Sequence, residues 1–396
     1  MFEQLQQLPA DPILGLMGLF ARDANPHKVD LGVGVYKTET GLTPVLDAIK
    51  RAEQALVAEQ TSKVYVGPAG NLAFLQSMMV LLLGEHQAQN LQPRLATLQT
   101  PGGCGALRVA AELIKKARPE ASIWVSDPTW GNHIPLLGNA GIRIKTYPYF
   151  DASRNALAVD AMMDALSQVP AGDLVLLHGC CHNPTGVDLQ PAHWQQIADL
   201  AAQRGFVPFV DMAYQGFGEG LDEDAYGLRL LMAQLPEVLF AVSCSKNFGL
   251  YRERVGLVGL LNHTAAGATA VMSHLTSIVR GIYSMPPDHG AELVARVLQS
   301  PELTALWRQE LVDMRERIQG LRMAFVAGMN SRGAAGRFDF IAQQRGMFSF
   351  LGLSEAQVAQ LAKISSIYLL GSSRASIAGL NHANLGYVCD AVARII

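Results

Sequence analysis

Short runs of apolar residues alternate with segments of helical periodicity between about residues 95 and 300 of the chain. The runs have the length of strands, and the segments between them repeat apolar residues three and four positions apart. The predicted strands are Leu95–Gln99, Ile123–Val125, Ile142–Thr146, Leu174–Leu177, Val207–Val210, Val238–Val242 and Val255–Leu261, and the predicted helices include Ala106–Ala117, Ala161–Ser167, Pro191–Ala202 and Ala225–Ala233. This alternation predicts an α/β fold whose mainly parallel sheet is flanked by helices.

The pattern changes after Pro301, where one long helix is predicted over about Leu303–Met329. It is followed by a strand near Met347–Phe350, a helix near Ser354–Lys363 and a strand near Ile367–Leu370. We expect a second, smaller α+β domain, which the segment before residue 44 joins, so that both chain ends contribute to it.

The composition limits the classes of function. A chain of 396 residues is longer than the chains that usually fold around a single hydrophobic core, which again favours two domains. Hydrophobic residues make up 49% and charged residues 16%, and the net charge is −3 without a long basic run. We therefore expect no nucleic acid and no membrane surface as a partner.

The five cysteines are odd in number and form no CxxC pair, which argues against disulfides and structural zinc. The most apolar stretch, Met78–Leu83, is too short to cross a bilayer. The N-terminal residues lack the basic and apolar regions of a signal peptide, so we expect a cytoplasmic protein.

Ligands of an open parallel sheet bind at the carboxyl ends of its strands, so the polar residues that follow each apolar run are the candidates for chemistry. After the first predicted strand comes Thr100-Pro-Gly-Gly-Cys-Gly-Ala-Leu-Arg108, a glycine-rich turn that leads into a helix and suits a phosphate. The turn could equally be a tight connection. It lacks the glycine patterns of dinucleotide-binding folds and P-loops.

Two further strand ends carry groups that suit a flat ring. The second is followed by a loop that contains Trp130 and His133, and a tryptophan there can stack on a ring or anchor the core. The fourth is followed by His178-Gly-Cys-Cys-His-Asn183-Pro-Thr-Gly186, a turn in which Asn183 can donate to a ligand oxygen. A metal on these histidines and cysteines is disfavoured, because vicinal cysteines of an extended chain point to opposite faces.

The last two strand ends carry the most reactive groups. Asp211-x-x-Tyr214 places a carboxylate and a phenol after one strand. Ser243-x-Ser245-Lys246, with Arg254 further on, places phosphate donors around a lysine after the next. A lone lysine is usually a surface charge, but one that follows a buried strand among phosphate donors is a candidate for a Schiff base.

Together, Asn183-Pro-Thr-Gly186, Asp211-x-x-Tyr214 and Ser243-x-Ser245-Lys246 resemble the pyridoxal-phosphate aminotransferases of fold type I. The chain is most similar to their aspartate and aromatic subgroup, over essentially its whole length from Asp11-Pro-Ile-Leu-Gly15 to Ala378-Gly-Leu-Asn381. The resemblance implies an arm over residues 1–12, a large domain that binds pyridoxal phosphate over 45–312, and a small domain from 13–44 and 313–396. It also implies a homodimer with shared active sites.

The resemblance implies a role for each candidate at the cofactor. Lys246 is expected to bind it as a Schiff base and to shuttle a proton, Asp211 to pair with the ring nitrogen, and Tyr214 to bond the ring oxygen. The other expected cofactor-binding residues are Gly103, Cys104, Trp130, His133, Asn183, Ser243, Ser245, Arg254 and, from the partner subunit of a dimer, Tyr65.

The same resemblance implies how substrates bind. Arg374 is expected to hold the α-carboxylate, and Arg280 to reach across the dimer to a distal carboxylate. Gly34, Trp130 and Asn183 are also expected at the substrate. The expected reaction transfers an amino group from an L-amino acid to a 2-oxo acid such as 2-oxoglutarate, in ping-pong fashion.

This chain departs from the family pattern at positions that affect how tightly the cofactor is retained and which substrates are accepted. Cys104 stands where a threonine or serine usually bonds the phosphate, and a thiol is a weak donor. Val64, Ile282 and Met285 stand where aspartate-specific enzymes usually have polar residues around the distal pocket. Apolar walls favour aromatic side chains, so we expect aromatic as well as dicarboxylic substrates, with an aspartate-preferring enzyme as the alternative.

Three other functions compete with transamination. A carbon–sulfur lyase or decarboxylase on the same fold is disfavoured by two arginines that suit two carboxylates. A ligand-sensing regulator is disfavoured because no DNA-binding segment precedes the fold. An NAD-dependent dehydrogenase lacks its glycine fingerprint.

Overall fold

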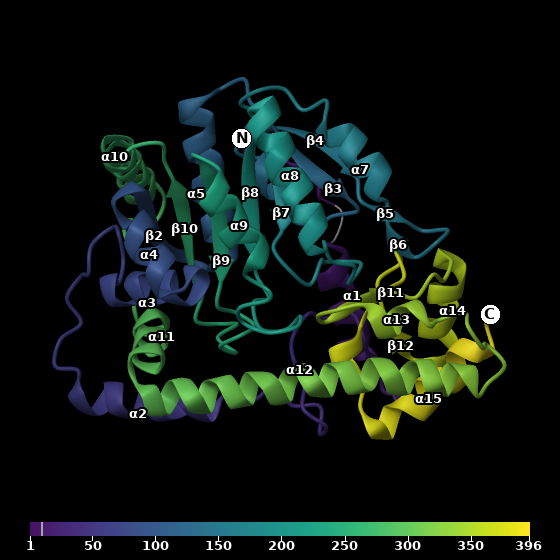
Figure 1. Cartoon of the computed structure of the whole chain (residues 1–396). Coiled ribbons are helices and arrows are strands. Elements are labelled where there is room, and N and C mark those ends of the chain that lie inside the picture. Colours follow the sequence, from purple (N-terminus) through teal and green to yellow (C-terminus); the bar gives the residue numbers. More distant parts are fainter. Residues whose placement is uncertain (9–10) are drawn as a thin grey trace.

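A seven-stranded sheet forms the centre of the fold (Figure 1). The structure is a computed structural model and describes residues 1–8 and 11–396. The strands lie in the order β2, β10, β9, β8, β7, β3, β4, and within this sheet only β10 runs against its neighbours. Their bounds are β2 (Leu95–Pro101), β3 (Ser122–Asp127), β4 (Arg143–Pro148), β7 (Leu174–His178), β8 (Val207–Met212), β9 (Val238–Ser243) and β10 (Val255–Leu261). The predicted α/β class with a mainly parallel sheet is confirmed.

Apolar residues alternate along each strand between two hydrophobic clusters, one on each face of the sheet. In β7, Leu174 and Leu176 belong to one cluster and Val175 and Leu177 to the other. Burial on both faces explains why central strands such as β7 and β10 read as unbroken apolar runs. The helices packed in the first cluster include α5 (Gly102–Ala117) and α10 (Ala265–Ile282), and those in the second include α7 (Val159–Leu166), α8 (Pro191–Arg204), α9 (Tyr226–Gln234) and α11 (His289–Gln299).

The two ends of the chain meet in a smaller α+β region, shown in purple and yellow in Figure 1. β1 (Val29–Asp30) pairs in parallel with β12 (Ile367–Tyr368), and β11 (Phe348–Phe350) pairs antiparallel with β13 (Arg374–Ser376). The helices of this region are α1 (Pro12–Arg22), α13 (Phe340–Gln343), α14 (Glu355–Ser365) and α15 (His382–Ala393). The predicted smaller α+β part from both chain ends is thus confirmed.

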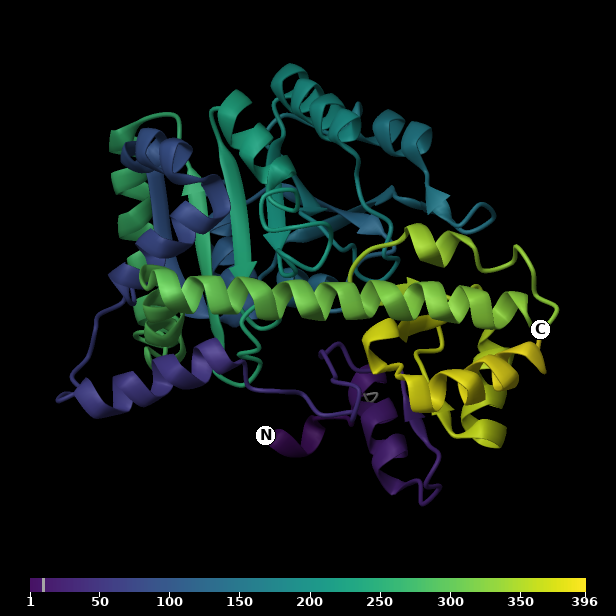
Figure 2. The ribbon, with the colours of Figure 1, turned by 60° about the horizontal axis from the view of Figure 1, so that its bottom comes forward.

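One helix, α12 (Pro301–Asn330), runs along both parts of the molecule (Figure 2). Ser300 caps its first turn, and its side chain accepts a hydrogen bond from the backbone of Leu303. The helix continues without interruption through the predicted boundary between residues 312 and 313. The domain boundaries therefore stay a prediction.

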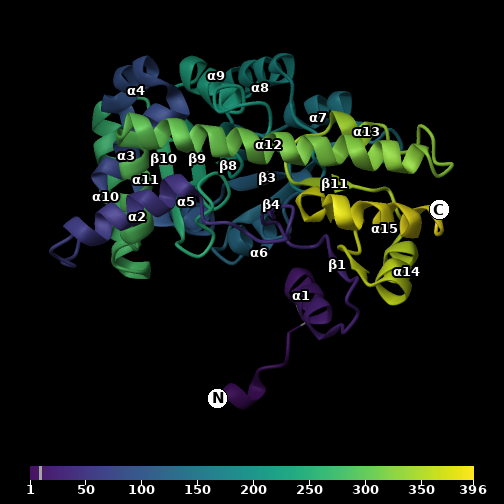
Figure 3. The same ribbon diagram turned by 90° about the horizontal axis from the view of Figure 1, so that it is seen from below.

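Residues 1–8 project away from the rest of the chain (Figure 3). Met1, Phe2, Leu5 and Leu8 are each at least 73% exposed. Residues 9 and 10 of the predicted arm, 1–12, lie outside the described residues. None of the helices in the described part of the chain combines the length and apolar character that crossing a membrane requires.

The other elements complete the fold. They are α2 (Asp47–Glu59), α3 (Leu72–Leu83), α4 (Glu85–Leu91), α6 (His133–Gly138), β5 (Phe150–Asp151) and β6 (Ala156–Leu157), with 3-10 turns at Phe2–Gln4, Gln92–Arg94 and Ile377–Gly379.

Candidate active site

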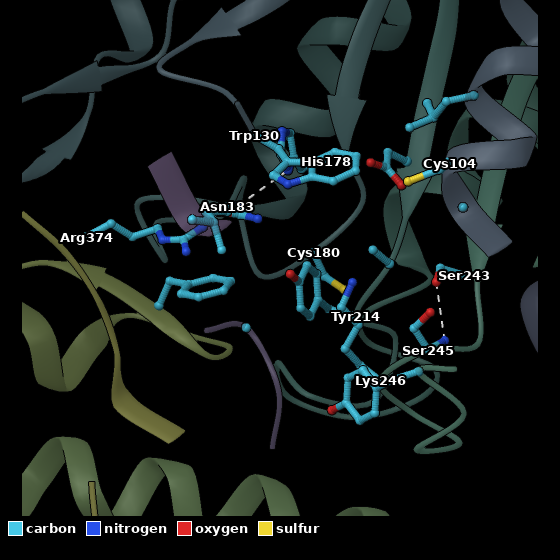
Figure 4. A pocket seen from close by; sticks show the side chains of 18 of the residues that line it. Cys104, Trp130, His178, Cys180, Asn183, Tyr214, Ser243, Ser245, Lys246 and Arg374 are labelled. Carbon is cyan, nitrogen blue, oxygen red and sulfur yellow. Dashed lines mark hydrogen bonds between the residues drawn. The ribbon is translucent and has the colours of Figure 1, made fainter. Parts of the chain in front are cut away.

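A cavity of about 260 Å³ lies at the carboxyl ends of the parallel strands, between the sheet and the smaller α+β region. Figure 4 shows Arg374 at one side of it and Ser243 and Ser245 at the other, with Tyr214 and Lys246 between them. Twelve of the fifteen predicted site residues line this cavity: Gly34, Gly103, Cys104, Trp130, Asn183, Asp211, Tyr214, Ser243, Ser245, Lys246, Arg254 and Arg374.

Lys246 lies on a turn that begins just after β9. The backbone N–H of Gly249 donates to the carbonyl of Lys246 at 3.0 Å, which closes the turn. The Lys246 ammonium nitrogen lies 4.7 Å from the centre of the Tyr214 ring. Burial lowers the pKa of Lys246 below its ordinary value, which increases the share of neutral, nucleophilic amine.

Asp211, at the end of β8, stands at the bottom of the cavity and is held by His133. His133 Nε2 lies 3.0 Å from Asp211 Oδ2, and both side chains are buried. Burial alone raises the pKa of Asp211, but the hydrogen bond from His133 opposes it, so that the net pKa is lowered. The carboxylate therefore stays charged, which suits a partner that carries a positive N–H.

The orientation of His133 is set by a chain of hydrogen bonds that the sequence did not reveal. Thr129 Oγ1 lies 2.8 Å from His133 Nδ1 and 3.3 Å from His178 Nε2. His178 Nδ1 accepts the backbone N–H of Asn183 at 3.4 Å, and burial lowers the pKa of His178 to about 3. His178 is thus neutral with its proton on Nε2, which it donates to Thr129 Oγ1. The same hydroxyl faces Nδ1 of His133, whose Nε2 faces Asp211.

Arg374 and Asn183 form the opposite wall of the cavity. Arg374 Nη1 donates to Asn183 Oδ1 at 3.2 Å, and Nη2 donates to the carbonyl of Gly32 at 2.7 Å. The guanidinium carbon lies 4.2 Å from the centre of the Phe348 ring. Burial lowers the pKa of Arg374 to about 10, so the group remains charged near neutral pH. Its Nε has no hydrogen-bond partner among the described residues.

The space in front of the first turn of α5 has the size and the donors that a phosphate group requires. A side chain at Gly103 would meet the Cβ of Ser243 at 3.1 Å, and one at Gly102 would meet Nη2 of Arg254 at 2.7 Å. The first N–H groups of α5 have no side-chain cap. Arg254 Nη1 donates to the hydroxyl of Ser245 at 3.3 Å. Two hydroxyls, a guanidinium and a helix N-terminus therefore converge where glycine leaves room, and they fit a phosphate.

Three predicted site residues lie outside the cavity. His133 lies behind Asp211, as described. Tyr65 is 86% exposed, and Arg280 is exposed at the end of α10, where it donates to Ser284. Both point to solvent in this single chain, so their roles stay predictions.

The cavity also contains residues that the sequence did not single out. Phe348 packs beside Arg374 and would meet any side chain at Gly34 at 2.7 Å. The hydroxyl of Tyr251 accepts the backbone N–H of Tyr36 at 2.9 Å. Ile13, Leu107, His178, Cys180 and Ala213 also line it. The sequence could have indicated Tyr251, because it belongs to the stretch that contains Lys246. No local feature of the sequence indicates that Phe348 or Ile13 lines the cavity.

The expectation that the vicinal cysteines point to opposite faces is wrong. Cys181 has a φ of +52°, so the chain is not extended there, and ligand atoms of Cys180, Cys181 and Asp224 lie within 4.8 Å of one another. The Asp224 carboxylate accepts backbone N–H groups at 2.7 to 2.9 Å, which occupies its oxygens. Burial raises the pKa of Cys181 to about 12, so it stays a neutral thiol. We therefore assign no metal to this cluster.

Comparison with known proteins places these features in context. A family model described as "Aminotransferase class I and II" matches residues 26–392. The chain is 46% identical to an aspartate aminotransferase of Salmonella typhi over the full length of both chains. It is also 46% identical to an aromatic-amino-acid aminotransferase of Pseudomonas aeruginosa, over 100% of this chain and 98% of the other.

Solved structures agree with the sequence matches. An aromatic-amino-acid aminotransferase from Burkholderia pseudomallei, in a structure described as covalently bound to pyridoxal phosphate, superposes with a TM-score of 0.97 at 42% identity. The match covers 100% of this chain and 99% of that one. A cytoplasmic aspartate aminotransferase from Saccharomyces cerevisiae gives a TM-score of 0.97 at 35% identity, over 100% of this chain and 98% of that one.

Proposed function

Since the chain belongs to the class I and II aminotransferases, we propose that it transfers the amino group of aromatic and dicarboxylic L-amino acids to 2-oxoglutarate. The expected family, the fold type and an aminotransferase activity with pyridoxal phosphate are confirmed by the family match and its neighbours. The observation that carries the proposal is one cavity that holds a buried lysine, a phosphate cradle and a buried arginine.

The residues that line the cavity fit pyridoxal phosphate. Ser243, Ser245, Arg254 and the start of α5 at Gly103 and Cys104 would hold its phosphate. Asp211, fixed by His133, would keep a proton on the ring nitrogen, and Trp130 would stack on the ring. Tyr214 and Asn183 would hold the ring oxygen, and Lys246 would bind the cofactor covalently. When bound, pyridoxal phosphate supplies an electron-withdrawing ring and a carbon that carries the amino group between the two substrates.

The remaining steps fall to side chains of this protein. Arg374 binds the α-carboxylate of the amino acid and so orients its Cα–H bond toward Lys246. Lys246, once its amine is free, removes that proton and returns it to a neighbouring carbon. Burial favours the neutral amine of Lys246, whose nitrogen lies 4.7 Å from the centre of the Tyr214 ring. Gly34 and Phe348 exclude water from the carboxylate end.

We place the second carboxylate site at a homodimer interface. Tyr65 and Arg280 reach solvent in a single chain, as residues that complete the partner subunit's cavity would. Exposed apolar side chains on the N-terminal segment and around Tyr65 support such an interface: Met1, Phe2, Leu5, Leu8, Val64 and Val66. We propose a cytoplasmic homodimer whose substrates are small molecules, namely amino acids and 2-oxo acids.

The substrate preference is tested by kcat/KM for phenylalanine, tyrosine and aspartate, each with 2-oxoglutarate. Val64 and Ile282 are exposed, and Met285 is half-buried, so they are free to line a neighbouring chain's distal pocket. We expect the aromatic values to lie within about tenfold of the aspartate value, because apolar walls discriminate only modestly. A kcat/KM for aspartate several hundredfold above the aromatic values would instead establish the alternative, an aspartate-preferring aminotransferase. Relatives that are named aspartate aminotransferase support this alternative.

Cys104 gives a prediction about cofactor retention. Replacing Cys104 with threonine should lower the Kd for pyridoxal phosphate by about five- to tenfold, because a hydroxyl replaces a weak thiol donor at the start of α5. Cofactor release during dialysis, followed by absorbance, measures the effect. Cys389, a buried cysteine of α15 far from the cavity lining, provides the control as Cys389→Ser. Unchanged retention in Cys104→Thr would show that position 104 does not bond the phosphate.

A further inference from the structure

Trp307, on the second turn of α12, contacts the turn that carries Lys246. Its side chain is completely buried. The indole Nε1–H donates to the backbone carbonyl of Asn247 at 2.7 Å. Asn247 is the residue directly after Lys246, so this bond attaches α12 to the main chain beside the lysine.

A second contact fixes the same turn. The ring of Phe248 stacks on that of Trp307, with centroids 4.4 Å apart and an angle of 2° between the planes. Phe248 is also completely buried. The turn is therefore held by a hydrogen bond to its main chain, by a stacked ring and by the internal Lys246–Gly249 bond. With its backbone held in this way, the lysine has only its side-chain torsions left to move.

We propose that Trp307 is a positioning residue of Lys246. The inference rests on the proposed function, in which Lys246 forms a covalent bond and then moves a proton. Both tasks need the amine at a defined place after it is released, when no covalent bond holds it there. The indole supplies the restraint through the carbonyl of Asn247. Proton transfer depends steeply on such placement, because a displacement of 1 Å can cost about 100-fold in rate.

Trp307→Phe tests the proposal, since it keeps a ring for stacking and removes the N–H donor. Trp124→Phe is the matched control, because the Trp124 indole donates to Asp173 at 3.0 Å and lies outside the cavity lining. In Trp307→Phe we expect kcat to fall by about tenfold with KM little changed. The deuterium isotope effect at the substrate Cα should rise, because the proton step becomes slower. Trp124→Phe should change neither quantity.

A measurement on the full-length apoprotein tests the role of Trp307 independently of the proposed function. Labelling of Lys246 by an amine-reactive reagent, quantified by peptide mass spectrometry across pH, gives its apparent pKa. Loosening the turn lets water reach the amine, so the apparent pKa in Trp307→Phe should rise by about half a unit toward the value of a free lysine. This holds whether or not the enzyme transaminates.

Two outcomes would overturn the proposal. One is a Trp307→Phe protein with a lower Tm but with wild-type labelling, kcat and isotope effect, which would make Trp307 a packing residue alone. If that variant does not fold, 3-benzothienylalanine at position 307 replaces the N–H by sulfur in a side chain of nearly the same shape. Wild-type values of all three quantities in that protein would be the second overturning result.

Discussion

Replacing Lys246 with alanine is expected to lower kcat for transamination on the order of 10⁴-fold, the upper range for loss of a proton-transferring group. The cavity contains no second lysine among the residues that line it. Tyr214 cannot substitute, because burial raises the pKa of its phenol, which therefore stays protonated. The fold should persist, since removal of a buried amine relieves a desolvation cost.

Absorbance and borohydride reduction separate this outcome from loss of the cofactor. Wild-type protein reconstituted with pyridoxal phosphate should show an imine band that borohydride bleaches. The reduced cofactor should then be found attached to the peptide that contains Lys246. Lys246→Ala should bind the cofactor, but borohydride should attach it to no lysine of the cavity. Lys145→Ala is the control, because Lys145 packs on Trp124 and lies outside the cavity lining. A wild-type protein that stays colourless after reconstitution would disprove the proposed function.

Replacing Arg374 with leucine is expected to lower kcat/KM for every amino acid by about 10²- to 10³-fold, because the substrate carboxylate would be buried without its partner. The arginine is 4% exposed and is fixed by Asn183, Gly32 and Phe348, so no flexible side chain has to be ordered on binding. Leucine would leave Asn183 Oδ1 and the Gly32 carbonyl without their donor, so we expect a lower Tm, and kcat/KM is compared at a temperature where both proteins are folded.

Arg280→Leu supplies the contrast for this prediction. If Arg280 reaches the distal carboxylate in the partner subunit's cavity, its loss should lower kcat/KM for aspartate and leave the value for phenylalanine nearly unaltered. Arg374→Leu should impair both substrates to the same extent. If Arg374→Leu lowered kcat/KM for aspartate alone, Arg374 would be assigned to the distal carboxylate and Arg280 to the α-carboxylate.

The central strands of the sheet could be predicted because they are buried on both faces. Val255–Leu261 was placed at its observed bounds, since all of its residues are apolar or glycine and all are buried. Some helices were harder to predict. For example, α3 is apolar on nearly every side, and no periodic polar face marks it as a helix.

The chemistry of the site could be predicted where it follows a strand directly. Asn183, Asp211 and Lys246 each stand just past a buried run, so the sheet itself brings them together. Phe348 enters the same cavity from a region more than 100 residues away along the chain, and only the tertiary fold reveals this. The positive φ of Cys181 was unpredictable for another reason, because few residues other than glycine adopt it.

The continuity of α12 has a thermodynamic consequence. The helix buries Trp307 and Leu311 near the lysine turn, and Phe325 and Met329 nearer its other end. Fraying at either end would expose apolar side chains and shorten the helix that the opposite end depends on. The sheet region and the smaller α+β region therefore share one unfolding equilibrium, and a ligand that stabilises one of them raises the free energy of unfolding of both.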